Sequence, residues 1–367
     1  FYTTNFGRKE ATPSMRPRSL SRLLLVLSSA TVARSVDVNP WHSSSLELGG
    51  GYDESSWLGT AEDRHHGMVF EEAARYELAI RGEPPKIFVL DAADESSTIT
   101  EILNRQEGVC AGQRLEGEPA SIGKEFRFWS SGHSQKQIEM EFWEYMNRWE
   151  NCDVDQMKID GNSRLLGGPH TPKFIKHTYA KLNVSEEELR FVVLLRDPVQ
   201  RAYAEYQNCV RNGRGCSPVQ ASNNFEETVA RELQDWKKCN AERDFTTTRW
   251  QGCGTCDGYS LPGLYAEQLE NWFQYFNSSQ FLVATEDMLK ESPKPLFNAI
   301  VDHIGLQDAA VPRFFPKAEA IELPESSTEL AQFFDQPNVK LLEMADTYPD
   351  VFFKHMPGTK QQFFKLP

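Results

Sequence analysis

The sequence is poor in positive charge: 39 lysines and arginines face 53 aspartates and glutamates, for a formal net charge of −14. A general nucleic-acid binder needs a basic face that displaces counterions, so this balance argues against nucleic acid as a partner. Internal repeats and low-complexity segments are absent as well. With 40% hydrophobic residues in 367, the chain is predicted to be globular, with ample material for a core.

Two signatures of bound nucleotide and metal are also missing. No G-x-x-x-x-G-K-[ST] motif occurs, which disfavours a nucleotide kinase. The Cys253-Gly-Thr-Cys256 pair offers half of a zinc site, but no second C-x-x-C and no H-x-x-x-H accompanies it. We therefore expect no metal and favour disulfides for these cysteines.

The N-terminal region follows the order of a secretory signal. From Met15, the expected start, come basic residues, an apolar run at 23–27 and then small residues. The run is shorter than the roughly 20 residues that cross a bilayer, so membrane association is expected only through this segment. A buried helix or a transit peptide are the alternatives. We predict an extension with a signal sequence at 1–35 and a linker at 36–83, in a protein of the Golgi lumen or a secreted one.

The seven cysteines suit an oxidising compartment. Five lie within one predicted insertion at 207–258, namely Cys209, Cys216, Cys239, Cys253 and Cys256. The odd total leaves at least one thiol unpaired or intermolecular, and sequence does not reveal the pairing. Asn183-Val184-Ser185 and Asn277-Ser278-Ser279 are glycosylation sequons and support the same compartment.

The most informative stretch is 191–206, FVVLLRDPVQRAYAEY. Its five apolar residues predict a buried parallel strand, which Pro198 ends. Asp197 is a good N-cap and Pro198 fits the first turn of a helix. Arg196 thus lies where helix amides point outward, an arrangement that binds anions, phosphate above all. The alternative is that Arg196 merely pairs with Asp197 or another carboxylate.

The pattern L-L-R-D-P-x-x-R-x-x-x-x-Y after such a strand resembles the 3'-phosphate element of sulfotransferases that use 3'-phosphoadenosine 5'-phosphosulfate (PAPS), especially the heparan sulfate and related carbohydrate group. The resemblance implies that Arg196 holds the 3'-phosphate; the family's serine eight positions later is Ala204 here. It extends over 84–355, with G-L-Y-x-x-Q-L at 263–269 and a final helix pair within 326–344. It implies a three-layer, P-loop-like α/β domain at 84–356 with a mostly parallel sheet, followed by a tail at 357–367.

A second strand and helix are predicted at 86–90 and 98–105, around the loop that holds the 5'-phosphosulfate in this family. The hydroxyl donors that the resemblance places there are Ser96, Ser97 and Thr98. The family's lysine and glycines are replaced by Ala93, Asp94 and Glu95. A domain that has lost the 5' site is the alternative interpretation of this acidic loop.

The segment K-E-F-R-F-W at 124–129 resembles the family's K-E-x-x-F-F, which implies Glu125 as the general base. Partial burial of Glu125 against aromatics such as Phe128 and Trp129 would raise its pKa toward neutrality. Without the resemblance, Glu125 would be an ordinary surface acid. Residues 158–165 take the place of the family's E-K-T-P-x-Y, with Asp160 where the lysine is expected.

The function implied is transfer of a sulfuryl group from PAPS, as co-substrate, to a hydroxyl or amine of a glycan or polysaccharide. The acidic balance makes a highly sulfated acceptor awkward unless basic residues share one groove. Lys173, Lys176 and Lys181 are candidates, although a solvated helix face is favoured for them. The alternative function is a catalytically degenerate member of the fold that binds glycans or acts as a scaffold.

Overall fold

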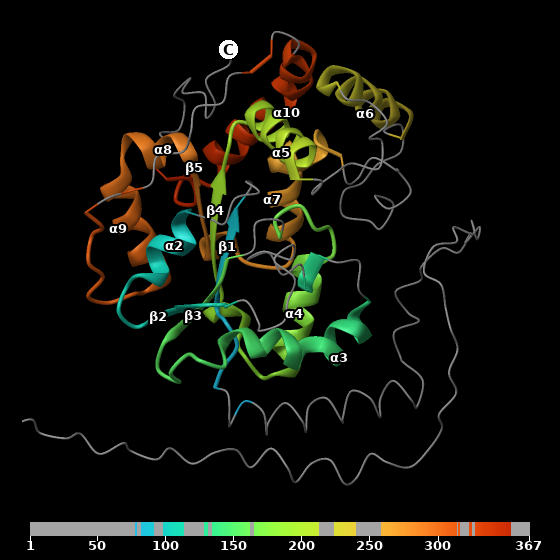
Figure 1. Cartoon of the computed structure of the whole chain (residues 1–367). Helices are drawn as coiled ribbons and strands as arrows, with labels where there is room; N and C mark the ends of the chain where they lie inside the picture. Colours follow the sequence, from blue (N-terminus) through green and yellow to red (C-terminus); the bar gives the residue numbers. More distant parts are fainter. Residues whose placement is uncertain are drawn as a thin grey trace, which may run out of the picture. The chain divides into compact units, whose positions relative to one another are not determined.

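Figure 1 shows the chain as a computed structural model, which describes residues 78, 82–91, 98–113, 128–130, 134–161, 165–212, 224–239, 258–313, 315, 323–324 and 327–353. All of them belong to one compact unit, residues 59–367. The predicted signal sequence, the tail at 357–367, Ser96, Ser97 and Glu125 lie outside the described residues, and of Thr98 only the backbone is described. Within these ranges no helix is both long and apolar enough to span a membrane.

The centre of the fold is a five-stranded sheet in the order β2-β3-β1-β4-β5. All four pairings between neighbouring strands are parallel. The strands are β1 (Ile87–Asp91), β2 (Val109–Ala111), β3 (Met157–Asp160), β4 (Arg190–Leu195) and β5 (Phe281–Thr285). The α/β fold with a parallel sheet, predicted from sequence, is confirmed.

Helices cover both faces of this sheet, so the domain has three layers (Figure 1). One layer contains α3 (Gln135–Met146), α4 (Thr171–Lys181) and α7 (Tyr265–Phe273). The other contains α2 (Thr98–Asn104), α8 (Glu286–Glu291) and α9 (Pro293–Ile304). A third apolar cluster joins α5 (Pro198–Asn212), α6 (Phe225–Cys239) and the start of α10 (Thr328–Thr347).

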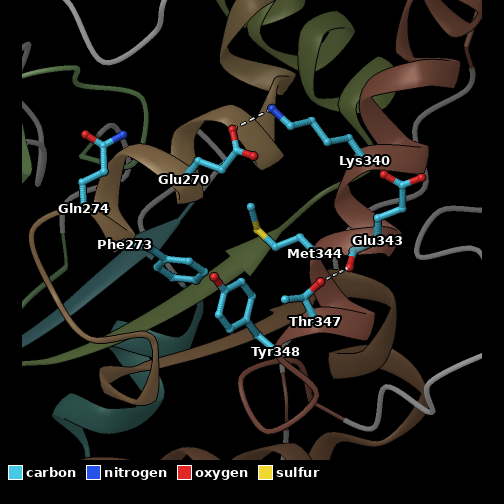
Figure 2. A pocket seen from close by; sticks show the side chains of 8 residues that line it. All are labelled: Glu270, Phe273, Gln274, Lys340, Glu343, Met344, Thr347 and Tyr348. Carbon is cyan, nitrogen blue, oxygen red and sulfur yellow. Dashed lines mark hydrogen bonds and ion pairs between the residues drawn. The ribbon is translucent and has the colours of Figure 1, made fainter.

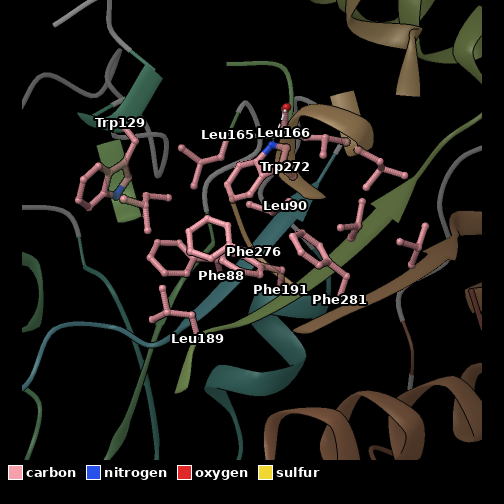
Figure 3. Packing of buried hydrophobic residues seen from close by; sticks show 14 of the residues in the cluster. Phe88, Leu90, Trp129, Leu165, Leu166, Leu189, Phe191, Trp272, Phe276 and Phe281 are labelled. Carbon is pink, nitrogen blue, oxygen red and sulfur yellow. Dashed lines mark hydrogen bonds between the residues drawn. The ribbon is translucent and has the colours of Figure 1, made fainter. Parts of the chain in front are cut away.

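Strand β4 shows why the sheet is buried on both faces. Phe191, Val193 and Leu195 pack in the layer of α4 and α7, while Val192 and Leu194 pack in the layer of α2 and α9. Alternate side chains point to opposite faces, so a fully apolar strand needs cover on both sides. Figure 3 shows Phe191 in its cluster, with Phe88 and Phe281 stacked at centroid distances of 5.7 and 4.6 Å.

The local signals at the end of β4 also hold. Helix α5 begins at Pro198, and the carboxylate Oδ1 of Asp197 accepts a hydrogen bond from the Gln200 amide at 2.8 Å. Helix α9 ends at Gly305, which takes a left-handed φ of 73°.

The final segment differs from the predicted helix pair. A single helix, α10, runs from Thr328 to Thr347 with Pro337 inside it. Leu330 and Phe334 before the proline and Leu341 and Met344 after it are all buried. Pro337 removes one backbone donor, and burial of the same helix face on both sides offsets that loss.

Much of the predicted cysteine-rich stretch is helical. Helix α5 continues to Asn212, and α6 occupies 225–239. Cys209 is disulfide-bonded. The structure also pairs Cys110 with Cys152, the two cysteines outside that stretch, and so joins β2 to the segment after α3.

Candidate functional site

The carboxyl ends of the parallel strands form the edge where α/β proteins bind ligands. Arg196 directly follows strand β4, and Glu286 directly follows its neighbour β5. Because Leu195 and Thr285 are in register, the two following residues lie side by side. The Nε of Arg196 lies 3.5 Å from Oε2 of Glu286. The alternative predicted from sequence, that Arg196 pairs with a carboxylate, is therefore observed for Glu286.

The turn that presents Arg196 is held by α7. The phenol of Tyr265 donates a hydrogen bond to the Arg196 carbonyl oxygen at 2.8 Å. Burial raises the pKa of Tyr265, so this hydroxyl keeps its proton and remains a donor. The backbone of Arg196 is thereby fixed between the strand end and the first turn of α5.

The guanidinium retains unused hydrogen-bonding capacity. Its Nε is buried and makes no hydrogen bond with any described residue, only the longer ion pair to Glu286. A buried donor of this kind fits an anionic oxygen. The expected serine position, Ala204 on α5, offers no hydroxyl.

Two carboxylates interact with this cation, those of Glu286 and Asp197, and both oppose a bound anion. Burial raises the pKa of Asp197, although backbone amides of Gln200 and Val199 stabilise its ionised form and Asp287 disfavours that form. Asp197 and Glu286 are thus the two acids beside Arg196. The site therefore combines a buried donor without a hydrogen bond to any described residue, Arg196 Nε, with a nearby carboxylate, Glu286, that would compete with a bound anion.

The 5' half of the predicted site is described only at its border. Its residues Ser96 and Ser97 and the proposed base Glu125 fall outside the described residues. A Cβ added at Gly161, just after β3, would collide with Oγ1 of Thr100. The first turn of α2 thus packs directly on the end of β3.

Asp160 is a functional candidate that sequence reasoning missed. Residues 157–160 form β3, and Asp160 at its end is buried with 8% exposure. The hydroxyl of Tyr145 donates a hydrogen bond to Asp160 Oδ2 at 2.7 Å. Burial raises the pKa of Asp160 to about 6, against the opposing effects of Tyr145 and the Arg148 charge. The signal available in the sequence was a carboxylate directly before Gly161.

The candidate basic residues on α4 do not form a free cationic groove. The ammonium of Lys176 lies 2.8 Å from Glu186, and that of Lys181 lies 2.6 Å from the buried carboxylate of Glu139. These pairs neutralise two of the three predicted lysines. The favoured sequence interpretation, a helix face rather than a polyanion groove, agrees with them.

A separate groove of about 460 Å³ lies between α7 and α10 (Figure 2). Its lining residues are Glu270, Phe273, Gln274, Lys340, Glu343, Met344, Thr347 and Tyr348. The ammonium of Lys340 on α10 forms a salt bridge with Glu270 on α7 at 2.6 Å, and the rings of Phe273 and Tyr348 meet edge to face. It lies at the end of α7 away from Tyr265 and has an acidic lining, so it does not suit a nucleotide.

Among the residues that the structure describes, no cluster of three or more His, Cys, Asp or Glu side chains could hold a metal ion.

Comparison with known proteins identifies the family. The profile of the sulfotransferase domain matches residues 113–335, more than half of the chain and downstream of β1 and α2. No curated protein matches in sequence. The chain is similar to the crystal structure of a sulfotransferase from Alicyclobacillus acidocaldarius, with 19% identity and a TM-score of 0.49 over 71% of this chain and 96% of that one. By its domain profile, the chain belongs to the sulfotransferase family.

Proposed function

We propose that this protein transfers a sulfuryl group from PAPS to a hydroxyl or amine of a carbohydrate acceptor, a glycan or polysaccharide. The observation that carries the proposal is Arg196: a cation at a strand end, beside the first turn of a helix, whose buried Nε lacks a hydrogen-bond acceptor among the described residues. Both features suit a terminal phosphate. PAPS would supply the group that is transferred.

Each candidate residue has one role in this proposal. Arg196 holds the 3'-phosphate and orients the nucleotide. The hydroxyls near the 5' end are those of Ser96, Ser97 and Thr98. Glu125 accepts the proton of the attacking acceptor group, as the resemblance of its segment implies. Positioning and charge carry most of such a transfer, by analogy with phosphoryl transfer.

The acceptor in this proposal carries little negative charge. Lys176 and Lys181 are engaged by Glu186 and Glu139, so they are not available to a polyanion. The chain's net charge of −14 would also repel a heavily sulfated chain. An unsulfated or sparsely charged glycan meets neither obstacle.

The proposed compartment is the secretory pathway, as a Golgi lumen or secreted protein. The Cys110–Cys152 disulfide supports it, because such bonds persist in oxidising compartments. The signal-like order at 15–35 and the two sequons favour the same route.

A second candidate is a protein that keeps the fold but binds glycans or acts as a scaffold without catalysis. The observation that favours it is Glu286, which lies 3.5 Å from Arg196 where a phosphate would bind. Ala204 and the acidic replacements Asp94 and Glu95 agree with it. Nucleotide binding separates the two candidates.

The test is calorimetric titration of the protein with 3'-phosphoadenosine 5'-phosphate, the spent co-substrate. Micromolar binding that Arg196→Ala weakens at least about a hundredfold would support the enzyme, since one charged hydrogen-bonded contact is worth roughly 3 kcal/mol. Arg190→Ala is the matched control, because Arg190 lies at the opposite end of the same strand. No binding at millimolar nucleotide would overturn the enzyme in favour of the scaffold.

A further inference from the structure

A buried carboxyl group lies inside the aromatic layer at the end of β3. Asp160 is 8% exposed and pairs in register with Phe88 of β1. Its Oδ2 accepts the hydrogen bond from Tyr145, itself 1% exposed on α3. Burying a carboxyl group is costly, and an apolar residue would fill this layer without that cost. The acid therefore needs an explanation beyond packing.

Tyr145 connects Asp160 to a short turn, η3 (Phe128–Ser130). The ring of Phe128 stacks on Tyr145 at 4.6 Å with an interplanar angle of 16°, and Trp129 meets it edge to face at 5.3 Å. Both aromatic residues are 1% exposed. Both rings are thus buried against Tyr145, the residue that donates its hydroxyl to Asp160.

The turn is also held from α4. The hydroxyl of Thr171, the first residue of α4, donates a hydrogen bond to the Trp129 carbonyl oxygen at 3.2 Å. The Trp129 Nε1 is buried and makes no hydrogen bond with any described residue. Burial raises the pKa of both Tyr145 and Asp160, and the nearby Trp129 indole lowers both. The indole donor therefore lies within electrostatic reach of the pair.

The charges around the carboxyl group come from three helical elements. Arg148 in η4 (Asn147–Trp149) is 5% exposed, and its charge favours ionised Asp160. Tyr145 on α3 and Tyr179 on α4 are the titratable hydroxyls beside it. An ionised carboxylate accepts hydrogen bonds more strongly than a neutral group, so ionisation of Asp160 tightens its hold on Tyr145.

We infer that Asp160 is a positioning residue, which acts through Tyr145 to hold the Phe128–Ser130 turn that follows directly on the 124–127 segment. The inference rests on the proposed function, because that segment contains Glu125, the proposed base. Asp160 does not touch the acceptor in this scheme. Its effect on the reaction is to fix the backbone of the Phe128–Ser130 turn, which directly follows the segment of Glu125. Small displacements of a base are costly in rate.

The direct test is hydrogen–deuterium exchange of amides 128–130, measured by mass spectrometry on the full chain. Asp160→Asn and Tyr145→Phe should each speed exchange there about tenfold, and the double variant should add little, since both break one chain of contacts. Glu232→Gln is the matched control, a buried carboxylate changed to an amide elsewhere in the domain. Equal exchange in Asp160→Asn and Glu232→Gln would overturn the inference.

The second readout is the rate of sulfuryl transfer. We expect Asp160→Asn to lower kcat about tenfold. The Kd of 3'-phosphoadenosine 5'-phosphate should stay unchanged, because Arg196, its proposed ligand, lies between β4 and α5 and not on β3 or α3. The pH profile of wild-type kcat should contain an ionisation near the Asp160 pKa of about 6 that the variant lacks. An unchanged kcat in an active enzyme would overturn the role in the reaction. A wild type that binds no nucleotide would overturn the proposed function alone, and exchange would still decide whether Asp160 holds the turn.

Discussion

Arg196 Nε lies 3.5 Å from Glu286 Oε2, and each side chain is 12% exposed. The two residues follow neighbouring strands in register, so their proximity is a consequence of the β4–β5 pairing. An anion that binds Arg196 must compete with this carboxylate. For the proposed nucleotide ligand, affinity would then depend on the balance between its phosphate and the Glu286 carboxylate.

The first prediction concerns that competition. Glu286→Gln should tighten binding of 3'-phosphoadenosine 5'-phosphate about tenfold, or roughly 1.4 kcal/mol, because it removes a nearby negative charge from a partly buried site. Asp287→Asn is the control on the same helix end, since Asp287 is more exposed and pairs with Lys290 at 3.0 Å. Calorimetry measures both. Weaker binding by Glu286→Gln would mean that Glu286 orients Arg196 for the ligand.

The second prediction is a pH dependence of stability. Burial gives Asp160 a folded pKa of about 6, above the value of about 3.9 for an unfolded aspartate. The folded state therefore holds this proton more tightly, and its share of the unfolding free energy is lost as pH rises from about 4 to about 6. Asp160→Asn should gain roughly 2–3 kcal/mol relative to wild type across that window. Urea denaturation at pH 4 to 7 measures it, and parallel curves would contradict it.

Local signals were sufficient to predict the β4–α5 unit. Five apolar residues in succession, Asp197 and Pro198 act within one stretch of chain, so no knowledge of the rest of the fold was needed. Strand β3 was missed because its four residues include Lys158 and Asp160, which do not look like a buried strand. Lys158 is accommodated since its ammonium donates to the Glu83 carbonyl oxygen at 2.9 Å.

The candidate site divides along the same line. Arg196 follows from its own strand and turn, whereas its partner Glu286 follows from the order of strands in the sheet. The burial of Asp160 depends on Tyr145, a residue of α3 that no local pattern connects with it. Contacts between distant parts of the chain decide which side chains pair in the site, and these contacts cannot be read from local patterns in a single sequence.

The third prediction concerns the Cys110–Cys152 disulfide, which spans a sequence separation of 42 residues. Cys110→Ser should lower the unfolding free energy by about 2–4 kcal/mol, because the unfolded chain gains the freedom that the closed loop denied it. Cys152→Ser and the double variant should match it, since each loses the same bond. Denaturant unfolding under non-reducing conditions gives the values. A much larger loss in the double variant would show that the cysteines contribute independently.

The fourth prediction concerns Glu232, a buried carboxylate on α6. It accepts hydrogen bonds from the amides of Tyr259 and Ser260, each at 2.9 Å, and from the Ser260 hydroxyl at 2.8 Å. Glu232→Gln should cost about 2–3 kcal/mol, because an amide group turns a donor toward at least one of these donors. Glu227→Gln on the same helix, with a side chain 61% exposed, should cost less than about 0.5 kcal/mol. Similar losses in both variants would refute the anchoring role.

The last prediction concerns Phe191, fully buried at the centre of the sheet. Besides the stacked rings of Phe88 and Phe281, Trp272 meets it edge to face at 5.2 Å. Phe191→Ala should lower the unfolding free energy by about 3–5 kcal/mol through lost burial and a cavity, and Phe191→Leu should lose clearly less. Val210→Ala, at a position 64% exposed on α5, should leave stability unchanged. Phe191 lies on β4, and Arg196 lies in the turn that follows this strand. If packing in the sheet core sets the position of that turn, Phe191→Leu will also weaken nucleotide binding. Calorimetry on the folded variant measures this effect.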